Sequence, residues 1–242
     1  MSEINLCIVA GTHGDEYPFG KFVQNYVQAE MPNTATMLKG NPLAIIYGRR
    51  FVYSDLNRVF DGSGSGYEAE RTDEIREIYQ RNGFTHVIDL HTSPTTHSVV
   101  PIVPGECDGP ENDRVINAIP SVNEIVKLPK SDKPSSLVGA FGPGGMGLEC
   151  PRYYAEKEFA GYIGQSIVGF LQGQDNPKQM RAIYAMKRLI PMEVDLNGDQ
   201  LDFTYSPELQ GDLFVAAPSI YKGYPGYNAQ GMVVDIEARR EI

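Results

Sequence analysis

Two apolar runs, Ile4–Ala10 (INLCIVA) and Thr85–His91 (THVIDLH), constrain the fold of this chain more than any other feature. Neither run keeps the strict alternation of apolar and polar residues that marks a strand with one face in water. Both are rich in residues that favour strands. Strands of this kind are buried on both faces, as in a parallel sheet covered by helices on each side. The two runs therefore predict an α/β fold.

Segments with apolar residues at helical spacing lie between and after these strands. The expected helices are Asp15–Gln28, Tyr67–Arg81 and Tyr154–Leu171. Strands that alternate with helices predict a mixed, largely parallel sheet flanked by helices. From about Lys187 the pattern changes to short β-like runs between turns, at Ile190–Val194, Leu213–Ala217 and Met232–Ile236. We predict two domains, an α/β domain over residues 1–186 and a small β-rich C-terminal domain over residues 187–242.

The overall charge limits the classes of partner. The formal net charge is −10 at pH 7 and the isoelectric point is about 4.9, a balance that disfavours nucleic acids and anionic membranes.

The three cysteines, Cys7, Cys107 and Cys150, fit neither a disulfide framework nor a metal knuckle, which favours a reducing compartment. No stretch reads as a signal peptide or approaches the roughly 18 apolar residues of a spanning helix. We therefore expect a soluble cytoplasmic protein, and a homo-oligomer remains open.

Side chains that could bind a metal follow both apolar strands. His13 and Glu16 come just after the first strand, and His91 ends the second. In α/β sheets ligands bind at the carboxyl ends of strands, where these residues would meet. Two imidazoles and one carboxylate, with one position open for water, are typical of a catalytic zinc site. The alternative is that these are ordinary polar residues in loops, because a histidine followed three positions later by a glutamate recurs by chance.

Two aspartates could support such a site. Asp89 lies two residues before His91 on the same strand face and could orient an imidazole. Asp15 could do the same or could cap the following helix. The remaining histidines, His86 and His97, lack this context and are interpreted as surface or structural residues.

A cluster of fixed hydrogen-bond donors lies between the two strands, in GRRFVYSDLNRVFDG (residues 48–62). Its donors are Arg49, Arg50, Asn57 and Arg58. Arginine forks bind carboxylates through two hydrogen bonds, so the cluster indicates a small anionic substrate, with Asp55 and Asp61 holding the arginines in place. The alternative is a solvated loop with ordinary salt bridges.

Glu149 ends a Gly-rich, apolar stretch that is poor in other charges. Burial there would raise its pKa and suit it to general acid and base catalysis. A surface glutamate at a strand end is the alternative.

Taken in order, GTHGDE, SDLNRVF, VIDLH and GLE resemble the aspartoacylase and succinylglutamate desuccinylase family, which are zinc amidohydrolases related to zinc carboxypeptidases. The resemblance covers roughly residues 4–151. It implies a zinc-carboxypeptidase-like fold, with residues 1–186 as the catalytic domain and a β-rich C-terminal domain that narrows the site entrance. His13, Glu16 and His91 match the ligands of one Zn²⁺ per chain.

The resemblance also implies roles for five other residues. Glu149 matches the general base that activates the metal-bound water, and Arg50 matches the arginine that polarises the substrate carbonyl. Asn57 and Arg58 match contacts to the substrate carboxylate, and Tyr221 matches a tyrosine that reaches the site. These roles imply hydrolysis of the amide bond of a small anionic N-acyl amino acid.

Two departures from the family leave the substrate open. The segment GLECPR (147–152) differs after the glutamate, and KPSSLVGAF (133–141) lacks the arginine that aspartoacylases carry for a second carboxylate. Lys133 or Arg152 could replace that arginine. The alternative functions are a metallocarboxypeptidase-type peptidase, a desuccinylase with another acyl group, or a catalytically silent relative that binds a carboxylated ligand. An α/β domain whose polar strand ends are incidental is a further alternative.

Overall fold

The structure, a computed structural model, describes residues 4–93, 98–152, 157–174, 176–191, 202–206, 210–216 and 230–242. Its strands are β1 (Leu6–Ala10), β2 (Ala35–Lys39), β3 (His86–Ser93), β4 (Val100–Val103), β5 (Glu124–Lys127), β6 (Gly145–Pro151), β7 (Met180–Pro191), β8 (Asp202–Ser206), β9 (Gly211–Ala216) and β10 (Gln230–Glu241). Its α-helices are α1 (Tyr17–Glu30), α2 (Pro42–Tyr47), α3 (Tyr67–Asn82), α4 (Pro110–Ala118), α5 (Leu137–Phe141) and α6 (Lys157–Leu171). Two short 3-10 turns, η1 (Gly14–Glu16) and η2 (Leu56–Arg58), complete the described elements.

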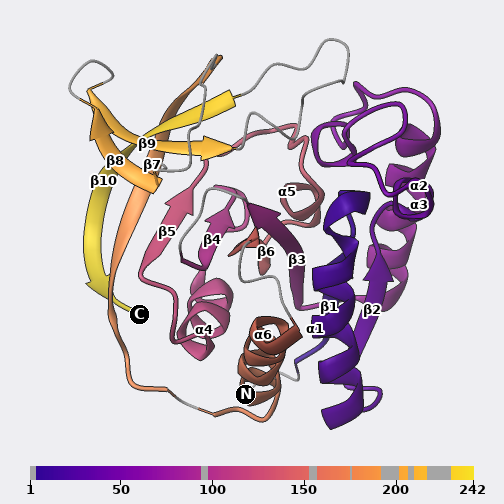
Figure 1. Cartoon of the computed structure of the whole chain (residues 1–242), viewed down its shortest axis with the longest axis horizontal. Helices are drawn as coiled ribbons and strands as arrows, with labels where there is room; N and C mark the ends of the chain where they lie inside the picture. The colour runs from indigo at the N-terminus through magenta and orange to yellow at the C-terminus, as the bar shows by residue number, and fades with distance from the viewer. Residues whose placement is uncertain are drawn as a thin grey trace.

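The strands form one mixed sheet in the order β2-β1-β3-β6-β4-β5-β7-β10-β9-β8 (Figure 1). The first four strands of this order are parallel, and β4, β5 and β7 are parallel to one another. The direction reverses where β4 pairs with β6 in antiparallel fashion. The last four strands of the order, β7, β10, β9 and β8, pair with one another in antiparallel fashion. The predicted mixed, largely parallel sheet is confirmed.

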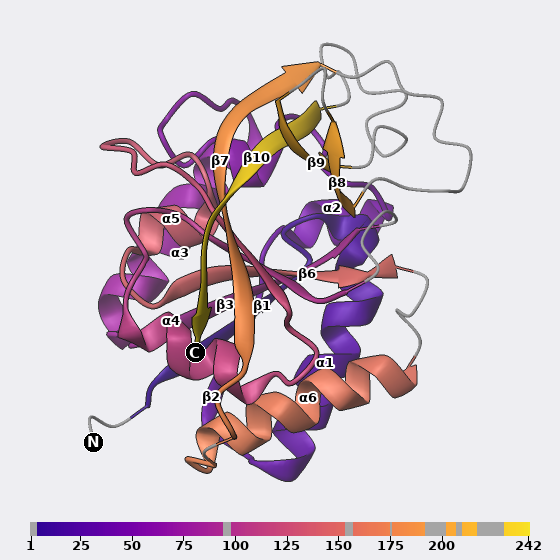
Figure 2. The same ribbon diagram turned by 90° about the vertical axis from the view of Figure 1, so that its left-hand side faces the viewer.

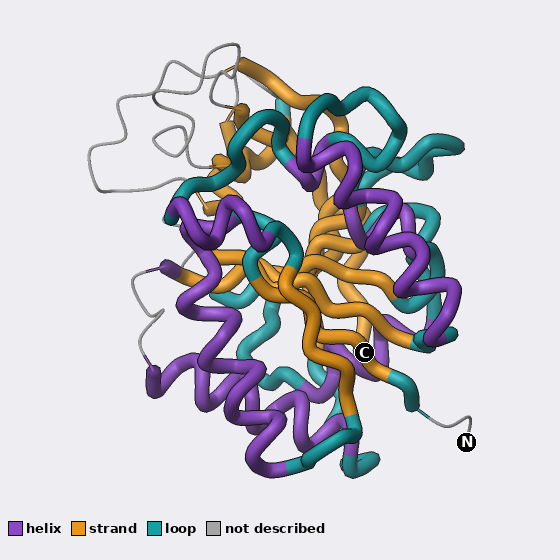
Figure 3. The backbone as a smooth tube through the Cα atoms, turned by 90° about the vertical axis from the view of Figure 1, so that its right-hand side faces the viewer, coloured by secondary structure: helices purple, strands orange, loops and turns teal. Residues whose placement is uncertain are grey.

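Helices cover both faces of the parallel part of the sheet, as Figure 3 shows. On one face, α1, α4 and α6 pack against Leu6, Ile8, Ile88 and Leu90. On the other face, α3 and α5 pack against Cys7, Val9 and Val87. All five residues of β1 and all eight of β3 are buried, which explains why these runs show no regular alternation. The three cysteines are buried and free.

Several predicted segments match the observed elements. The apolar run Ile4–Ala10 contains β1, the run Thr85–His91 lies largely in β3, and the predicted helix over residues 67–81 is α3. Residues 157–171 of the third predicted helix form α6, and its first residues lie outside the described part. The short strands β2, β4 and β5 were not predicted, because a run of four or five residues holds too few repeats to reveal a period.

The described part of the chain after residue 186 lies mainly in strands. Figure 2 shows β7 and β10 running side by side along the height of the molecule. Position 186/187 falls inside β7, which also pairs with β5 through Ala182–Ala185. The described strands on both sides of this position belong to one sheet, and the division into residues 1–186 and 187–242 stays a prediction. No helix in the described ranges is long and apolar enough to cross a membrane.

The turn after β1 depends on close backbone packing with α2. Asn41 caps α2 by accepting a hydrogen bond from Ala44 N at 3.0 Å. A Cβ atom at Gly14 would lie 2.2 Å from the carbonyl carbon of Ala44 and 2.3 Å from its oxygen. The Gly14 amide also donates to Arg50 O at 3.2 Å. Only glycine therefore fits between the helix and the turn.

We predict that Gly14→Ala lowers the free energy of unfolding by about 1–3 kcal/mol, because the methyl group must displace backbone atoms of α2. Urea denaturation measures the change. Gly161→Ala in α6 is the matched control, since its Cβ would meet only Tyr26 Cδ2, at 3.9 Å. The control should be neutral or stabilising by up to about 1 kcal/mol. Equal stability of Gly14→Ala and the wild type would contradict the packing argument.

Candidate metal centre

Three parallel strands bring the predicted site residues together at the carboxyl-terminal end of the sheet. β1, β3 and β6 are adjacent, so their carboxyl ends meet there. η1 follows β1 and carries Glu16, with His13 as its N-cap residue. His91 lies near the end of β3 and is directly opposite Glu149 of β6 in the strand register. The two side chains therefore leave the sheet on the same face.

His13, Glu16 and His91 form the one group of possible metal ligands found in the described ranges, with the ligand atoms all within 4.8 Å of one another. His13 Nδ1 lies 2.9 Å from Glu16 Oε1, and His91 Nδ1 lies 3.1 Å from Glu16 Oε2. The two Nδ1 atoms are 3.2 Å apart. Each of the three residues is at most 5% exposed. The sequence prediction that they converge is confirmed.

A buried aspartate holds the second nitrogen of each imidazole. His13 Nε2 lies 3.2 Å from Asp55 Oδ1, and His91 Nε2 lies 2.8 Å from Asp89 Oδ2. Both aspartates are fully buried. The Thr12 hydroxyl donates to Asp89 Oδ1 at 2.7 Å and keeps that carboxylate in place. When each aspartate accepts a hydrogen bond from Nε2–H, both Nδ1 atoms can offer a lone pair to a metal ion.

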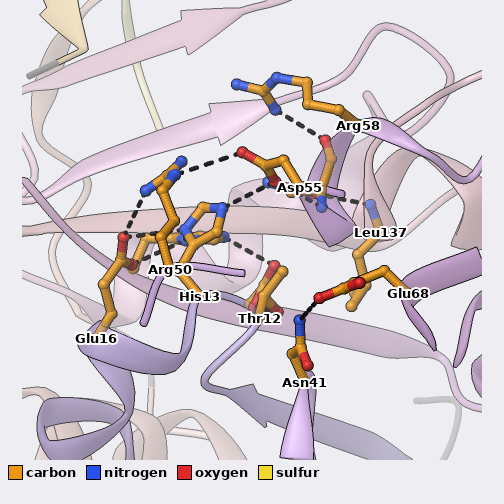
Figure 4. Close-up of polar contacts among 12 residues, drawn as sticks. Thr12, His13, Glu16, Asn41, Arg50, Asp55, Arg58, Glu68 and Leu137 are labelled. Atoms are coloured by element: carbon orange, nitrogen blue, oxygen red, sulfur yellow. Dashed lines mark hydrogen bonds and ion pairs between the residues drawn. The ribbon is translucent and has the colours of Figure 1, made fainter. Parts of the chain in front are cut away.

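Arg50 lies in the segment that follows α2 and contacts two carboxylates of the cluster. Its Nη1 donates to Glu16 Oε1 at 3.1 Å, and its Nε donates to Asp55 Oδ2 at 3.4 Å. Figure 4 shows the guanidinium between these two carboxylates. The amide of Thr92 donates to Glu16 Oε2 at 3.0 Å. Arg50 is only 5% exposed, so it adds a fixed positive charge at the metal cluster.

These contacts shift the acidity of the carboxylates. Burial alone would raise the pKa of Glu16, but His13 and His91 outweigh it and hold that pKa well below its ordinary value. Burial opposes ionisation of Asp55 as well, yet His13 and Arg50 keep its pKa well below the usual range. Both groups are therefore carboxylates at neutral pH, as a metal ligand and its supporting acceptor must be.

The imidazoles and Glu149 shift in the opposite direction. Burial and Arg50 would lower the pKa of His13, but the carboxylates of Glu16 and Asp55 raise it. Burial would also lower the pKa of His91, but Asp89 and Glu16 raise it well above the ordinary value. Glu149 is half-buried. The loss of contact with bulk water, aided by the negative charge of Glu16, raises its pKa although His91 opposes the shift. A carboxylate with a raised pKa is a stronger base, which suits general acid and base catalysis.

The structure also positions the predicted substrate contacts. Asn57 lies in η2, where its Oδ1 accepts from Leu137 N at 2.9 Å. This bond assigns the oxygen, so the side-chain NH₂ group is the end that can meet an anion. Arg58 is exposed, and its Nη1 donates to Asn57 O at 2.8 Å. Tyr221 and His97 lie outside the described residues.

One sequence interpretation changes in the structure. Asp15 was expected to orient an imidazole or cap a helix, but its Oδ2 lies 3.1 Å from Arg152 Nη2. The ion pair joins η1 to the residue that follows β6. The two meet because β1 and β6 are parallel and finish at the same end of the sheet. His86 was interpreted as surface or structural, and it is buried against Phe170, with ring centroids 5.1 Å apart.

Two supporting residues, Thr12 and Glu68, were not predicted from the sequence. The hydroxyl of Thr12 is separated by 77 positions from the aspartate to which it donates. Glu68 is fully buried, although it lies in a highly charged helix that reads as solvent-exposed. Its position in the first turn, one residue after Tyr67, is only a weak signal for this role.

Comparison with known proteins agrees with this geometry. The family model of the succinylglutamate desuccinylase/aspartoacylase catalytic domain matches residues 2–135. A probable aspartoacylase from Nostoc sp. is 31% identical over 143 residues, which is 53% of this chain and 48% of that protein. A succinylglutamate desuccinylase from Pseudomonas paraeruginosa is 37% identical over 86 residues, or 32% of this chain and 26% of that protein. The matched segments thus span half or less of these relatives.

A solved structure shows the same fold over almost the whole chain. The succinylglutamate desuccinylase from Chromobacterium violaceum has a TM-score of 0.74 at 16% identity, over 98% of this chain and 86% of that one. The fold is the zinc-carboxypeptidase-like α/β fold predicted from the sequence. Since the family model covers more than half of the sequence, the chain belongs to the succinylglutamate desuccinylase/aspartoacylase family.

Proposed function

We propose that this protein is a zinc-dependent amidohydrolase that removes the acyl group from a small N-acyl amino acid. The observation that carries the proposal is the buried cluster of His13, Glu16 and His91, in which an aspartate holds each imidazole by its Nε2. Family membership supports hydrolysis of an N-acyl amino acid.

The spacing of the ligand atoms supports zinc. Nitrogen and oxygen atoms bound tetrahedrally to zinc at about 2.0–2.2 Å lie about 3.3 Å from one another. The two Nδ1 atoms are 3.2 Å apart, and they approach different oxygens of Glu16 at 2.9 and 3.1 Å. With one ligand atom from each residue, all three lie within 4.8 Å of one another, a group that one ion can join. Zinc bound there would supply a water of lowered pKa and polarise the substrate carbonyl.

The protein groups around the cluster suit amide hydrolysis. Glu149 takes a proton from the attacking water and then gives a proton to the leaving amine. Water oxygen bonds to the acyl carbon, the carbon–nitrogen bond breaks, and a carboxylic acid and an amino acid are released. Arg50 lies beside Glu16 and stabilises the negative charge that develops on the carbonyl oxygen, a contribution typically of about 3–4 kcal/mol per good donor.

Residues of η2 and the C-terminal region bind the substrate. Asn57 and Arg58 bind its α-carboxylate through their side-chain donors. Two hydrogen bonds that hold Asn57, from its backbone amide to Asp55 and from the Leu137 amide to its Oδ1, support this assignment. By the family resemblance alone, Tyr221 is assigned as a further substrate contact. Screening N-acetyl, N-formyl and N-succinyl amino acids with added zinc tests this assignment. Cleavage of peptides but of none of these compounds would favour the carboxypeptidase alternative.

We predict that the purified protein binds about one zinc ion per chain, and that His13→Ala and His91→Ala each lose it, because each substitution leaves too few ligands to hold zinc. Elemental analysis after mild purification measures the content. His86→Gln is the control, since this histidine lies at the start of β3, away from the cluster. A wild-type protein that binds no divalent metal stoichiometrically would contradict the proposal.

We predict that Glu149→Gln keeps zinc but lowers kcat by about 100-fold or more, since the amide cannot carry the proton. Initial rates with the best substrate of the screen measure the effect, with metal content determined on the same sample. Glu158→Gln, at an exposed position of α6, is the matched control and should leave the rate unchanged. An unchanged rate in Glu149→Gln would remove Glu149 from the mechanism.

A further inference from the structure

Glu68 carries a fully buried carboxylate that the mechanism above does not use. Its Oε1 accepts hydrogen bonds from Asn41 Nδ2 at 3.1 Å and from Val52 N at 2.8 Å. Its Oε2 accepts from Tyr53 N at 3.1 Å and from Ser54 N at 3.3 Å. One side chain thus binds three consecutive backbone amides. Figure 4 shows it meeting Asn41 beside the metal cluster.

Amide donors, rather than a cation, compensate this buried charge. A buried carboxylate is costly unless hydrogen bonds satisfy it, and both oxygens of Glu68 accept two each. In the described part of the chain, the ion pairs include none to Glu68. Its place in the first turn of α3 adds the favourable field of the helix N-terminus. The carboxylate is therefore matched to the amides of residues 52–54 and would lose most of its partners if they moved.

The segment that Glu68 holds connects the groups proposed to act on the substrate. Arg50 precedes residues 52–54, and Asp55, which contacts both Arg50 and His13, follows them directly. The Asp55 carboxylate also accepts from Asn57 N at 2.9 Å and so begins η2. The positions of Asn57 and Arg58 consequently depend on residues 52–54.

A second contact extends this support to the metal-binding turn. The side-chain NH₂ group of Asn41 donates to Glu68, and its side-chain oxygen caps α2. The backbone amide of Asn41 donates to Gly11 O at 2.8 Å. α2 packs directly against Gly14. Glu68 therefore links the substrate-binding segment to the turn that carries His13.

We propose that Glu68 is a positioning residue that orders residues 52–54 and so presents Arg50, Asn57 and Arg58 to the substrate. The part that concerns substrate rests on the proposed function. The part that concerns order in residues 52–54 depends only on the hydrogen bonds of Glu68. The two parts can therefore be tested separately.

Glu68→Gln is the sharpest variant, because it keeps the size of the side chain. Whichever way the amide turns, its NH₂ group faces two donors in place of an acceptor. Glu70→Gln is the matched control, since this exposed residue occupies the same first turn of α3. A residue that only stabilises the fold would lower the melting temperature without changing KM selectively.

Hydrogen exchange followed by NMR tests the order directly. In the wild type, the amides of residues 52–54 should exchange more slowly than the Ser131 amide, which donates to Glu106 at an exposed site. In Glu68→Gln they should exchange about 100-fold faster, while the amides of β1 and β3 stay protected. Wild-type amides that exchange as fast as that of Ser131 would overturn the proposal, even if Glu68→Gln fails to fold.

Kinetics test the link to substrate. Glu68→Gln should raise KM by about tenfold or more through Asn57 and Arg58 and should also lower kcat through Arg50, with zinc still at one per chain. Glu70→Gln should match the wild type. A folded Glu68→Gln protein with wild-type KM would overturn the positioning role. If the wild type hydrolyses no N-acyl amino acid, the proposed function fails, and the exchange measurement still decides the role of Glu68 in ordering residues 52–54.

Discussion

The hydrogen bonds from His13 and His91 to two buried aspartates are the interactions on which the rest of the site depends. An imidazole has two nitrogens, and only the one without a proton can bind a metal. Asp55 and Asp89 accept hydrogen bonds from Nε2–H and so leave both Nδ1 atoms, which face Glu16, with a free lone pair. Without these carboxylates each ring could rotate or take the other tautomer, and the three ligand atoms would no longer converge.

Charge balance explains why this cluster suits a divalent cation. Glu16, Asp55 and Asp89 place three carboxylates in a region with almost no exposure to water. Arg50 contacts two of them. The raised pKa of both His13 and His91 shows that the surroundings favour added positive charge. A metal ion would supply that charge in place of protons, since it binds the neutral imidazole.

The site is held by backbone packing as much as by its side chains. Gly14 lets α2 approach the metal-binding turn, and Asn41 joins the cap of α2 to Gly11 at the end of β1. Glu68 then binds the amides of the segment that leads to Asp55. The groups proposed to bind metal and substrate are thus joined through hydrogen bonds and close backbone packing. This arrangement limits motion where ligand geometry must hold to a few tenths of an ångström.

The sequence by itself determined the buried strands and the residues at their ends. One apolar run is followed by His13 and Glu16, and another ends in Asp89 and His91. Together they predict a shared site, because the carboxyl ends of parallel strands lie at the same end of the sheet. Only the tertiary structure decided which nitrogen of each histidine faces the site and which distant groups support it. Asp55 is 42 positions from His13, and Thr12 is 77 from Asp89, and no local periodicity encodes such contacts. Glu68 shows the same limit, since its burial follows from the path of residues 52–54 rather than from the charged helix in which it lies.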